Sequence, residues 1–161
     1  MNIRSATDAD WPLIWPFFDA IVKDGQTYAY PPDLTIETGR SLWMEPTPSQ
    51  TVVAFEGDVV LGSAKMGPNR PARGAHVATA SFMVDPTARG RGVGRRLGEY
   101  VVGWARSEGY RGIQFNAVVA THTAAVRLWR DLGFEIIGTV PEAFDHRVHG
   151  LVGLHVMHLS L

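Results

Sequence analysis

The 161-residue sequence contains no cysteine. Disulfide bonds, zinc sites built on thiolates and a cysteine nucleophile are therefore excluded. No stretch approaches the ~18 uncharged apolar residues that a membrane-spanning helix requires, so we expect no membrane partner. The first eight residues lack the apolar core of a secretory signal, which favours a cytoplasmic location.

An excess of charge of one sign is also missing. The 15 basic and 16 acidic residues give a net charge of −1, which argues against a basic face for nucleic acid. The six histidines do not indicate a metal site either. His155 and His158 are three residues apart on a predicted strand and so point to opposite faces. His146 and His149 have no third ligand beside them. We therefore expect no nucleic-acid partner and no metal.

The length and the 45% apolar content are typical of one globular domain, which we take to span residues 1–161. Hydrophobic periodicity predicts strands at 2–5, 51–55, 59–66, 76–84, 112–119, 134–140 and 151–159, and helices at 7–25, 90–109 and 121–133. Residues 26–50 form an irregular segment rich in aromatics and prolines, where we expect one or two short helices or turns, with 36–43 as the candidate, that would wall a pocket. Helices that alternate with strands after a run of hairpins favour an α/β (α+β) fold, with a mixed sheet and helices on its faces.

The most informative segment is the turn that follows the strand at 76–84 and opens the next helix. It reads Gly-Arg-Gly-Val-Gly at 90–94, with Arg89, Arg95 and Arg96 beside it. Glycines let a ligand approach the backbone closely, the free N–H groups of a first helical turn favour an anion, and arginine forks suit phosphate oxygens. The segment therefore predicts a phosphate or pyrophosphate site. A glycine-rich connection with solvated arginines is the alternative, and neither the dinucleotide pattern nor the P-loop pattern is matched.

These residues resemble the GNAT superfamily of acetyl-CoA-dependent N-acetyltransferases. The family pattern Arg/Gln-x-x-Gly-x-Gly/Ala after Val-x-Pro is matched by Arg89–Gly94 after Val84–Pro86. A second family segment, Asn-x-x-Ala-x-x-Leu-Tyr followed by Gly-Phe, is matched from His122 to Phe134. The segment Thr27–Pro32 resembles the corresponding part of family members that act on small amino-acid-like amines, including the phosphinothricin and azetidine-carboxylate types. The resemblance implies transfer of an acetyl group from acetyl-CoA to a primary or secondary amine of a small molecule, by direct attack in a ternary complex.

The resemblance also implies a mostly antiparallel sheet of about seven strands, splayed between 76–84 and 112–119, with helices on both faces. The pantetheine arm of acetyl-CoA would lie in that opening, and the Val84 N–H would polarise the thioester carbonyl. Backbone N–H groups of Gly90–Arg95 would hold the pyrophosphate. The implied cofactor-binding residues are Phe82, Met83, Val84, Arg89, Gly90, Arg91, Gly92, Val93, Gly94, Arg95, His122, Ala125 and Trp129.

The sequence departs from the family pattern at the catalytic positions. The frequent asparagine is His122 here, and the tyrosine that protonates the departing thiolate is Trp129, whose indole does not titrate. The strand at 76–84 has no carboxylate to act as a base. Asn116, on a strand that lines the expected opening, is the catalytic candidate, with a purely structural amide as the alternative. His122 is a weaker candidate, chosen because imidazole titrates near neutral pH.

The acceptor and the assembly are predicted from less specific features. Tyr28, Tyr30 and Asn116 are expected to bind the acceptor amine, although plain packing also explains the two tyrosines. A peptide or protein N-acetyltransferase and a non-catalytic acyl-CoA sensor are the alternative functions. The strand at 151–159 is apolar enough to pair at a sheet edge, which favours a homodimer.

Overall fold

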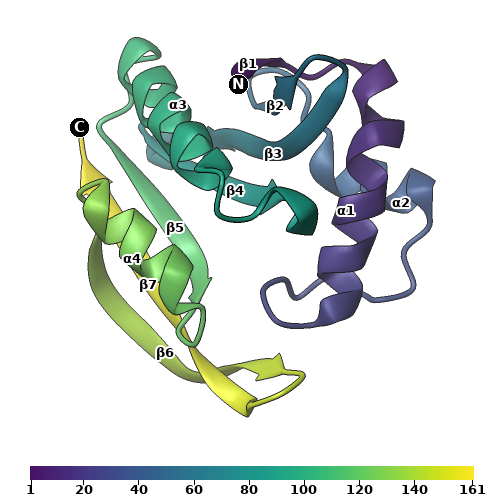
Figure 1. The fold of residues 1–161 in the computed structure, drawn as a ribbon. Helices are drawn as coiled ribbons and strands as arrows, with labels where there is room; N and C mark the ends of the chain where they lie inside the picture. The colour runs from purple at the N-terminus through teal and green to yellow at the C-terminus, as the bar shows by residue number, and fades with distance from the viewer.

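Seven strands form one sheet in the order β1-β2-β3-β4-β5-β7-β6 in the computed structural model, which describes all 161 residues (Figure 1). The strands are β1 (Asn2–Ser5), β2 (Gln50–Glu56), β3 (Val59–Pro68), β4 (Val77–Val84), β5 (Gly112–Val119), β6 (Glu135–His146) and β7 (Gly150–Ser160). The helices are α1 (Trp11–Asp24), α2 (Ile36–Trp43), α3 (Val93–Ser107) and α4 (Thr123–Asp131). All strand pairs are antiparallel except β4 with β5. The predicted mixed α/β fold is confirmed.

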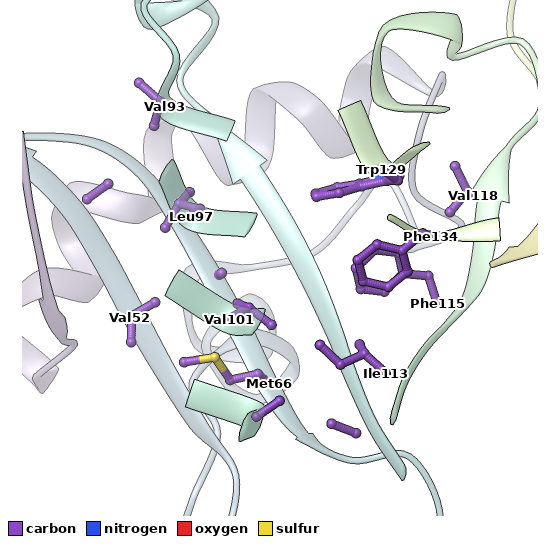
Figure 2. Close-up of a cluster of buried hydrophobic side chains, with 14 of the residues drawn as sticks. Val52, Met66, Val93, Leu97, Val101, Ile113, Phe115, Val118, Trp129 and Phe134 are labelled. Atoms are coloured by element: carbon purple, nitrogen blue, oxygen red, sulfur yellow. The ribbon is translucent and has the colours of Figure 1, made fainter. Parts of the chain in front are cut away.

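Helices cover both faces of the sheet, as expected. On one face, α1 and α2 bury an aromatic core that includes Phe18 and Trp43 and reaches Met83 of β4. On the other face, α3 and α4 bury a second core in which Leu97 and Trp129 take part (Figure 2). Because neighbouring residues of a strand point to opposite faces, β4 supplies side chains to both cores.

The sheet opens between β4 and β5. These strands are parallel and pair only through Val77 with Gly112 and Ala78 with Ile113. Beyond Ala78, β4 remains paired with β3 on its other side as far as Val84. One edge of β4 from residue 79 onward therefore has no strand partner, and the splay implied by the resemblance lies at the expected place.

Aromatic side chains wedge the two strands apart. Trp129 of α4 lies with its ring centre 4.6 Å from that of Phe82 on β4 and 4.9 Å from that of Phe115 on β5. Phe134 stacks on Phe115 at 4.3 Å, and Figure 2 shows this pair beside Trp129. All but Phe82 are buried. The indole at 129 is therefore part of the core that holds the splay open.

The last strand is not at an edge of the sheet. β7 lies between β5 and β6, and its backbone is paired on both sides. The expectation that residues 151–159 pair with another chain at an edge is therefore wrong, because β6 runs to His146 and covers β7. The edges are β1 and β6. No helix of the structure is long and apolar enough to cross a membrane.

Candidate active site

A preformed glycine turn precedes α3. The Asp85 side chain accepts hydrogen bonds from the Thr87 backbone N–H (2.8 Å) and hydroxyl (2.7 Å), which fixes the chain as it leaves β4. Gly90 and Gly92 then have φ of 78° and 76°, in the left-handed region that favours glycine. A Cβ added at either glycine would meet no atom within 4 Å. The space beside the turn is open to a ligand.

The amides at the start of α3 face this open side. The helical hydrogen bonds begin with the Arg96 N–H, which donates to the Gly92 carbonyl at 3.1 Å. The N–H groups of Val93, Gly94 and Arg95 precede that bond and have no acceptor within the helix. The Arg91 N–H is the exception among the expected amides, because it donates to the Ala88 carbonyl at 3.4 Å. The remaining amides suit an anion.

Two arginines of the turn are held by surface ion pairs. Arg91 contacts Glu56 at 2.5 Å and Arg95 contacts Asp131 at 2.7 Å. All four side chains are 44–50% exposed, and exposed pairs contribute only about 0–1 kcal/mol. Either guanidinium can therefore exchange its carboxylate for a phosphate at small cost.

His122 lies at the same end of the molecule as the turn. It is the residue that precedes α4, and its backbone N–H donates to the Val119 carbonyl at 2.9 Å. Desolvation lowers the pKa of the His122 imidazole, and the positive charge of Arg89 lowers it further. The two segments that resemble the family pattern, Arg89–Gly94 and the one that begins at His122, therefore lie close together. A lowered pKa leaves the ring neutral at pH 7, able to bond a ligand and poorly suited to act as an acid. Ala125, one turn along α4, packs against the second core.

The free edge of β4 presents the backbone of alternate residues. The His76 carbonyl accepts from Arg111 on the β5 side, and the Asp85 N–H donates to Leu61 on the β3 side. By alternation, Phe82 and Val84 turn their N–H and C=O groups toward the opening. Met83 does not, because its backbone faces β3 and its side chain is 1% exposed. The expected pairing of Met83 with a ligand in the opening is therefore corrected.

Tyr28 reaches this edge from the segment after α1. Its hydroxyl donates to the Phe82 carbonyl at 2.7 Å and accepts from the Phe82 N–H at 3.0 Å. Its ring stacks on Tyr30, with centres 5.4 Å apart, and meets Trp43 edge-on. Burial raises the pKa of the Tyr28 phenol far above its ordinary value. Tyr28 therefore bonds the strand edge, and it does not line the pocket described next.

A pocket of about 260 Å³ lies against β3 and β4 on the face covered by α1 and α2. Asn116 lines it from β5, and Tyr30 lines it from the irregular segment. The Asn116 amide donates to the Asn69 Oδ1 at 2.7 Å and accepts from Gln114 at 2.8 Å, so it also has structural bonds. The lining residues are Tyr30, Glu45, Ser49, Lys65, Met66, Gly67, Pro68, Thr79, Ala80, Ser81 and Asn116.

The pocket contains two charged residues that sequence reasoning missed. The Lys65 Nζ donates to Glu45 Oε1 at 3.0 Å and to the Leu42 carbonyl at 2.7 Å. An ammonium has three donors, so one is left for a ligand. A sequence signal did exist, because Lys65 is the only charged residue of β3. Glu45 follows α2, and only the fold brings it to the strand.

The comparisons with known proteins agree on one family. The model described as "Acetyltransferase (GNAT) family" matches residues 12–134. A GCN5-related N-acetyltransferase from Kribbella flavida is 62% identical, with a TM-score of 0.96, over 99% of this chain and 97% of that one. An L-methionine sulfoximine/L-methionine sulfone acetyltransferase from Pseudomonas aeruginosa is 30% identical, over 88% of this chain and 84% of that protein.

A more distant structure carries a ligand. The protein yncA from Salmonella typhimurium, solved with its cofactor acetyl-CoA, has a TM-score of 0.85 and 24% identity, over 100% of this chain and 94% of that one. It therefore shares the fold. The chain also matches two yeast proteins over about half of its own length and spans 40% and 13% of theirs.

Proposed function

The chain belongs to the GNAT family of acetyltransferases, and we propose that it transfers the acetyl group of acetyl-CoA to the amine of a small molecule. One observation carries this proposal. The sheet opens after two β4–β5 pairs, with a preformed anion-binding turn at one end of the free strand edge and a small polar pocket on the other face. The two substrates can then approach the opening from opposite faces.

The residues present fit acetyl-CoA, which would supply the activated thioester. The open side of the turn, with the amides that precede the helical ladder, suits a pyrophosphate. Val84 offers free backbone groups to the amide-rich arm, and the Phe82 carbonyl becomes available when the Tyr28 hydroxyl rotates away from it. The proposed cofactor-binding set is the one expected from the sequence without Met83, with Arg91 contributing its guanidinium because its N–H is already bonded.

The pocket supports a small, polar acceptor. A volume of about 260 Å³ suits an amino acid better than a protein surface. The ion pair of Lys65 and Glu45 leaves the lining without net charge, which suits a zwitterion better than a polycation. The Pseudomonas relative is named for amino-acid derivatives. We therefore propose an amino-acid-like amine, with Tyr30 and Asn116 beside it.

Direct transfer requires a neutral amine and a polarised carbonyl. Glu45 is the only carboxylate of the pocket, and we propose that it orients the acceptor nitrogen and receives its proton directly or through water. The backbone N–H of Val84 faces the opening and is the proposed donor for the thioester oxygen, because the Phe82 N–H already donates to the Tyr28 hydroxyl. With no cysteine in the chain, no acyl-cysteine intermediate forms.

Thiol release from acetyl-CoA tests the proposal, because the protein contributes no thiol background. The panel pairs each amino acid with the amine that lacks its carboxylate, and it includes short peptides. Turnover of amino acids above their decarboxylated partners is expected. Turnover only with peptides would favour a peptide acceptor. Binding of acetyl-CoA without turnover of any amine would favour the sensor, and no binding would refute the proposal.

A homodimer and a cytoplasmic location stay predictions. The apolar side chains Ile137, Val140 and Leu151 of the β6–β7 hairpin are 52–61% exposed and offer a surface for a second copy. Sedimentation equilibrium would measure the mass in solution, and a monomer at every concentration would contradict the dimer.

A further inference from the structure

Phe82 is the only residue of β4 whose backbone is bonded by a side chain. The Tyr28 hydroxyl lies against both its N–H and its C=O, on the edge that faces the opening. The two residues are 54 positions apart, and the contact is part-buried. Tyr28 thus places a phenol on the edge of β4 that has no strand partner, against the backbone groups of Phe82.

Packing fixes the phenol in this place. Tyr30 stacks on one face of the ring, and Trp43 meets it edge-on at 6.1 Å. Trp43 is fully buried, and its indole N–H donates to the Ser63 Oγ at 2.9 Å. The ring of Tyr28 is therefore held by the first core, while its hydroxyl remains at the strand edge.

The hydroxyl keeps its proton at neutral pH. Burial raises the pKa of the phenol, so Tyr28 cannot serve as a base, and a neutral hydroxyl donates one hydrogen bond while it can accept two. The bond to the Phe82 carbonyl uses that one donor. Rotation about the C–O bond is enough to redirect it, since the oxygen can stay beside the Phe82 N–H.

We propose that Tyr28 is a catalytic residue whose hydroxyl donates a hydrogen bond to the acetyl oxygen while its own oxygen still accepts from the Phe82 N–H. This inference rests on the proposed acetyl transfer. When the amine nitrogen bonds to the carbonyl carbon, the C=O π electrons move to oxygen, and the Tyr28 hydroxyl stabilises the negative charge that develops there. When the C=O bond reforms, the C–S bond breaks and the thiolate leaves. The proton lost by nitrogen reaches sulfur through Glu45 or water, and Tyr28 keeps its own.

The role explains how the chain can do without a titrating residue at 129. Trp129 is buried in the wedge between β4 and β5, so it does not supply the donor that the family pattern carries there. Tyr28 approaches Phe82 from the opposite face of the sheet, from the α1–α2 side. The face that receives the acceptor then also supplies the donor to the acetyl oxygen.

The test compares Tyr28→Phe with Tyr110→Phe, the same loss of a hydroxyl outside the site, where Tyr110 packs on Trp104. In assays of thiol release, Tyr28→Phe should lower kcat about 100-fold, the effect of removing one oxyanion donor. The Kd of acetyl-CoA, measured by calorimetry, should change less than about threefold, because the donor acts mainly on the transition state. Tyr110→Phe should leave both unchanged.

Two further readouts separate catalysis from structure. The profile of kcat against pH should fall uniformly in Tyr28→Phe without losing a limb, because Tyr28 does not titrate. A second variant is needed in case Tyr28→Phe unfolds. Incorporation of 3-fluorotyrosine at position 28 keeps the hydroxyl, so this protein should retain the kcat of the wild type. If no acceptor is known, slow hydrolysis of acetyl-CoA reports on the same oxygen.

Tighter binding of acetyl-CoA by Tyr28→Phe with unchanged kcat would overturn the proposal, since the hydroxyl would then only occupy the edge. An unchanged kcat with unchanged binding would overturn it as well. Failure of the wild-type protein to bind acetyl-CoA would instead refute the proposed function itself.

Discussion

Substitution of Gly92 by alanine tests the anion-binding turn. Gly92 has φ 76° and immediately precedes the first residue of α3. A left-handed conformation costs a residue with a Cβ about 1–2 kcal/mol. The new methyl group meets no protein atom within 4 Å, so no steric clash adds to that cost. We expect the free energy of unfolding to fall by about 1–2 kcal/mol.

The same methyl group points into the space assigned to the pyrophosphate. We expect the Kd of acetyl-CoA to rise at least about tenfold, which corresponds to 1.4 kcal/mol of binding free energy. Urea unfolding and calorimetry measure the two effects separately. Gly103→Ala is the matched control, because it adds a methyl in the exposed middle of the same helix, also with no atom within 4 Å.

The control should move stability in the opposite direction. An alanine in a helix interior is favoured over glycine by about 0.5–1 kcal/mol, so Gly103→Ala should stabilise the fold and leave the Kd unchanged. A Gly92→Ala protein with the stability of the wild type and the same Kd would refute the reasoning. The turn would then need neither its backbone conformation nor an open side.

Two further predictions concern stability. In Gly98→Ala the new Cβ would lie 2.6 Å from a Leu132 methyl and 3.0 Å from the Trp129 ring. Overpacking of this kind lowers the free energy of unfolding by about 1–3 kcal/mol. Differential scanning fluorimetry should therefore show a lower Tm for this variant. The ion pair with Arg4 lowers the pKa of Asp10 from 3.8 to about 2, so its stabilisation is present above pH 4 and is lost between pH 4 and 2. Asp10→Asn should therefore cost at most about 2 kcal/mol at pH 7, and the difference from the wild type in urea unfolding should vanish near pH 2.

The sequence predicted the elements that depend on near neighbours. Alternating apolar residues placed most strands within a few positions, and the glycines at 90 and 92 marked a turn that indeed needs positive φ. These patterns are local, because φ preferences and side-chain alternation act between residues a few positions apart. The helix α1 was located in the same way, and its hydrogen-bonded span continues past Pro16 to Asp24.

The sequence also misjudged positions whose role depends on orientation. Met83 was expected at the ligand because the family resemblance implies that the backbone of residues 82–84 pairs with the pantetheine arm. Because alternate residues of a strand turn their backbone groups to opposite edges, either Met83 or the pair Phe82 and Val84 can face a ligand, but not all three. The sequence does not say which edge of β4 is free. Trp129, by contrast, was not expected to be catalytic, because indole does not titrate, and the structure places it in the core between β4 and β5.

The composition and the local pattern by themselves determined that this chain is an α/β protein with a positive-φ glycine turn before α3 and no thiol chemistry. Only the tertiary structure decided that β7 is internal, that Lys65 and Glu45 share the pocket, and that Tyr28 bonds Phe82 across 54 positions. Contacts of this kind depend on the order in which strands pair and on side chains that meet from distant segments. No periodicity within a single segment encodes that order.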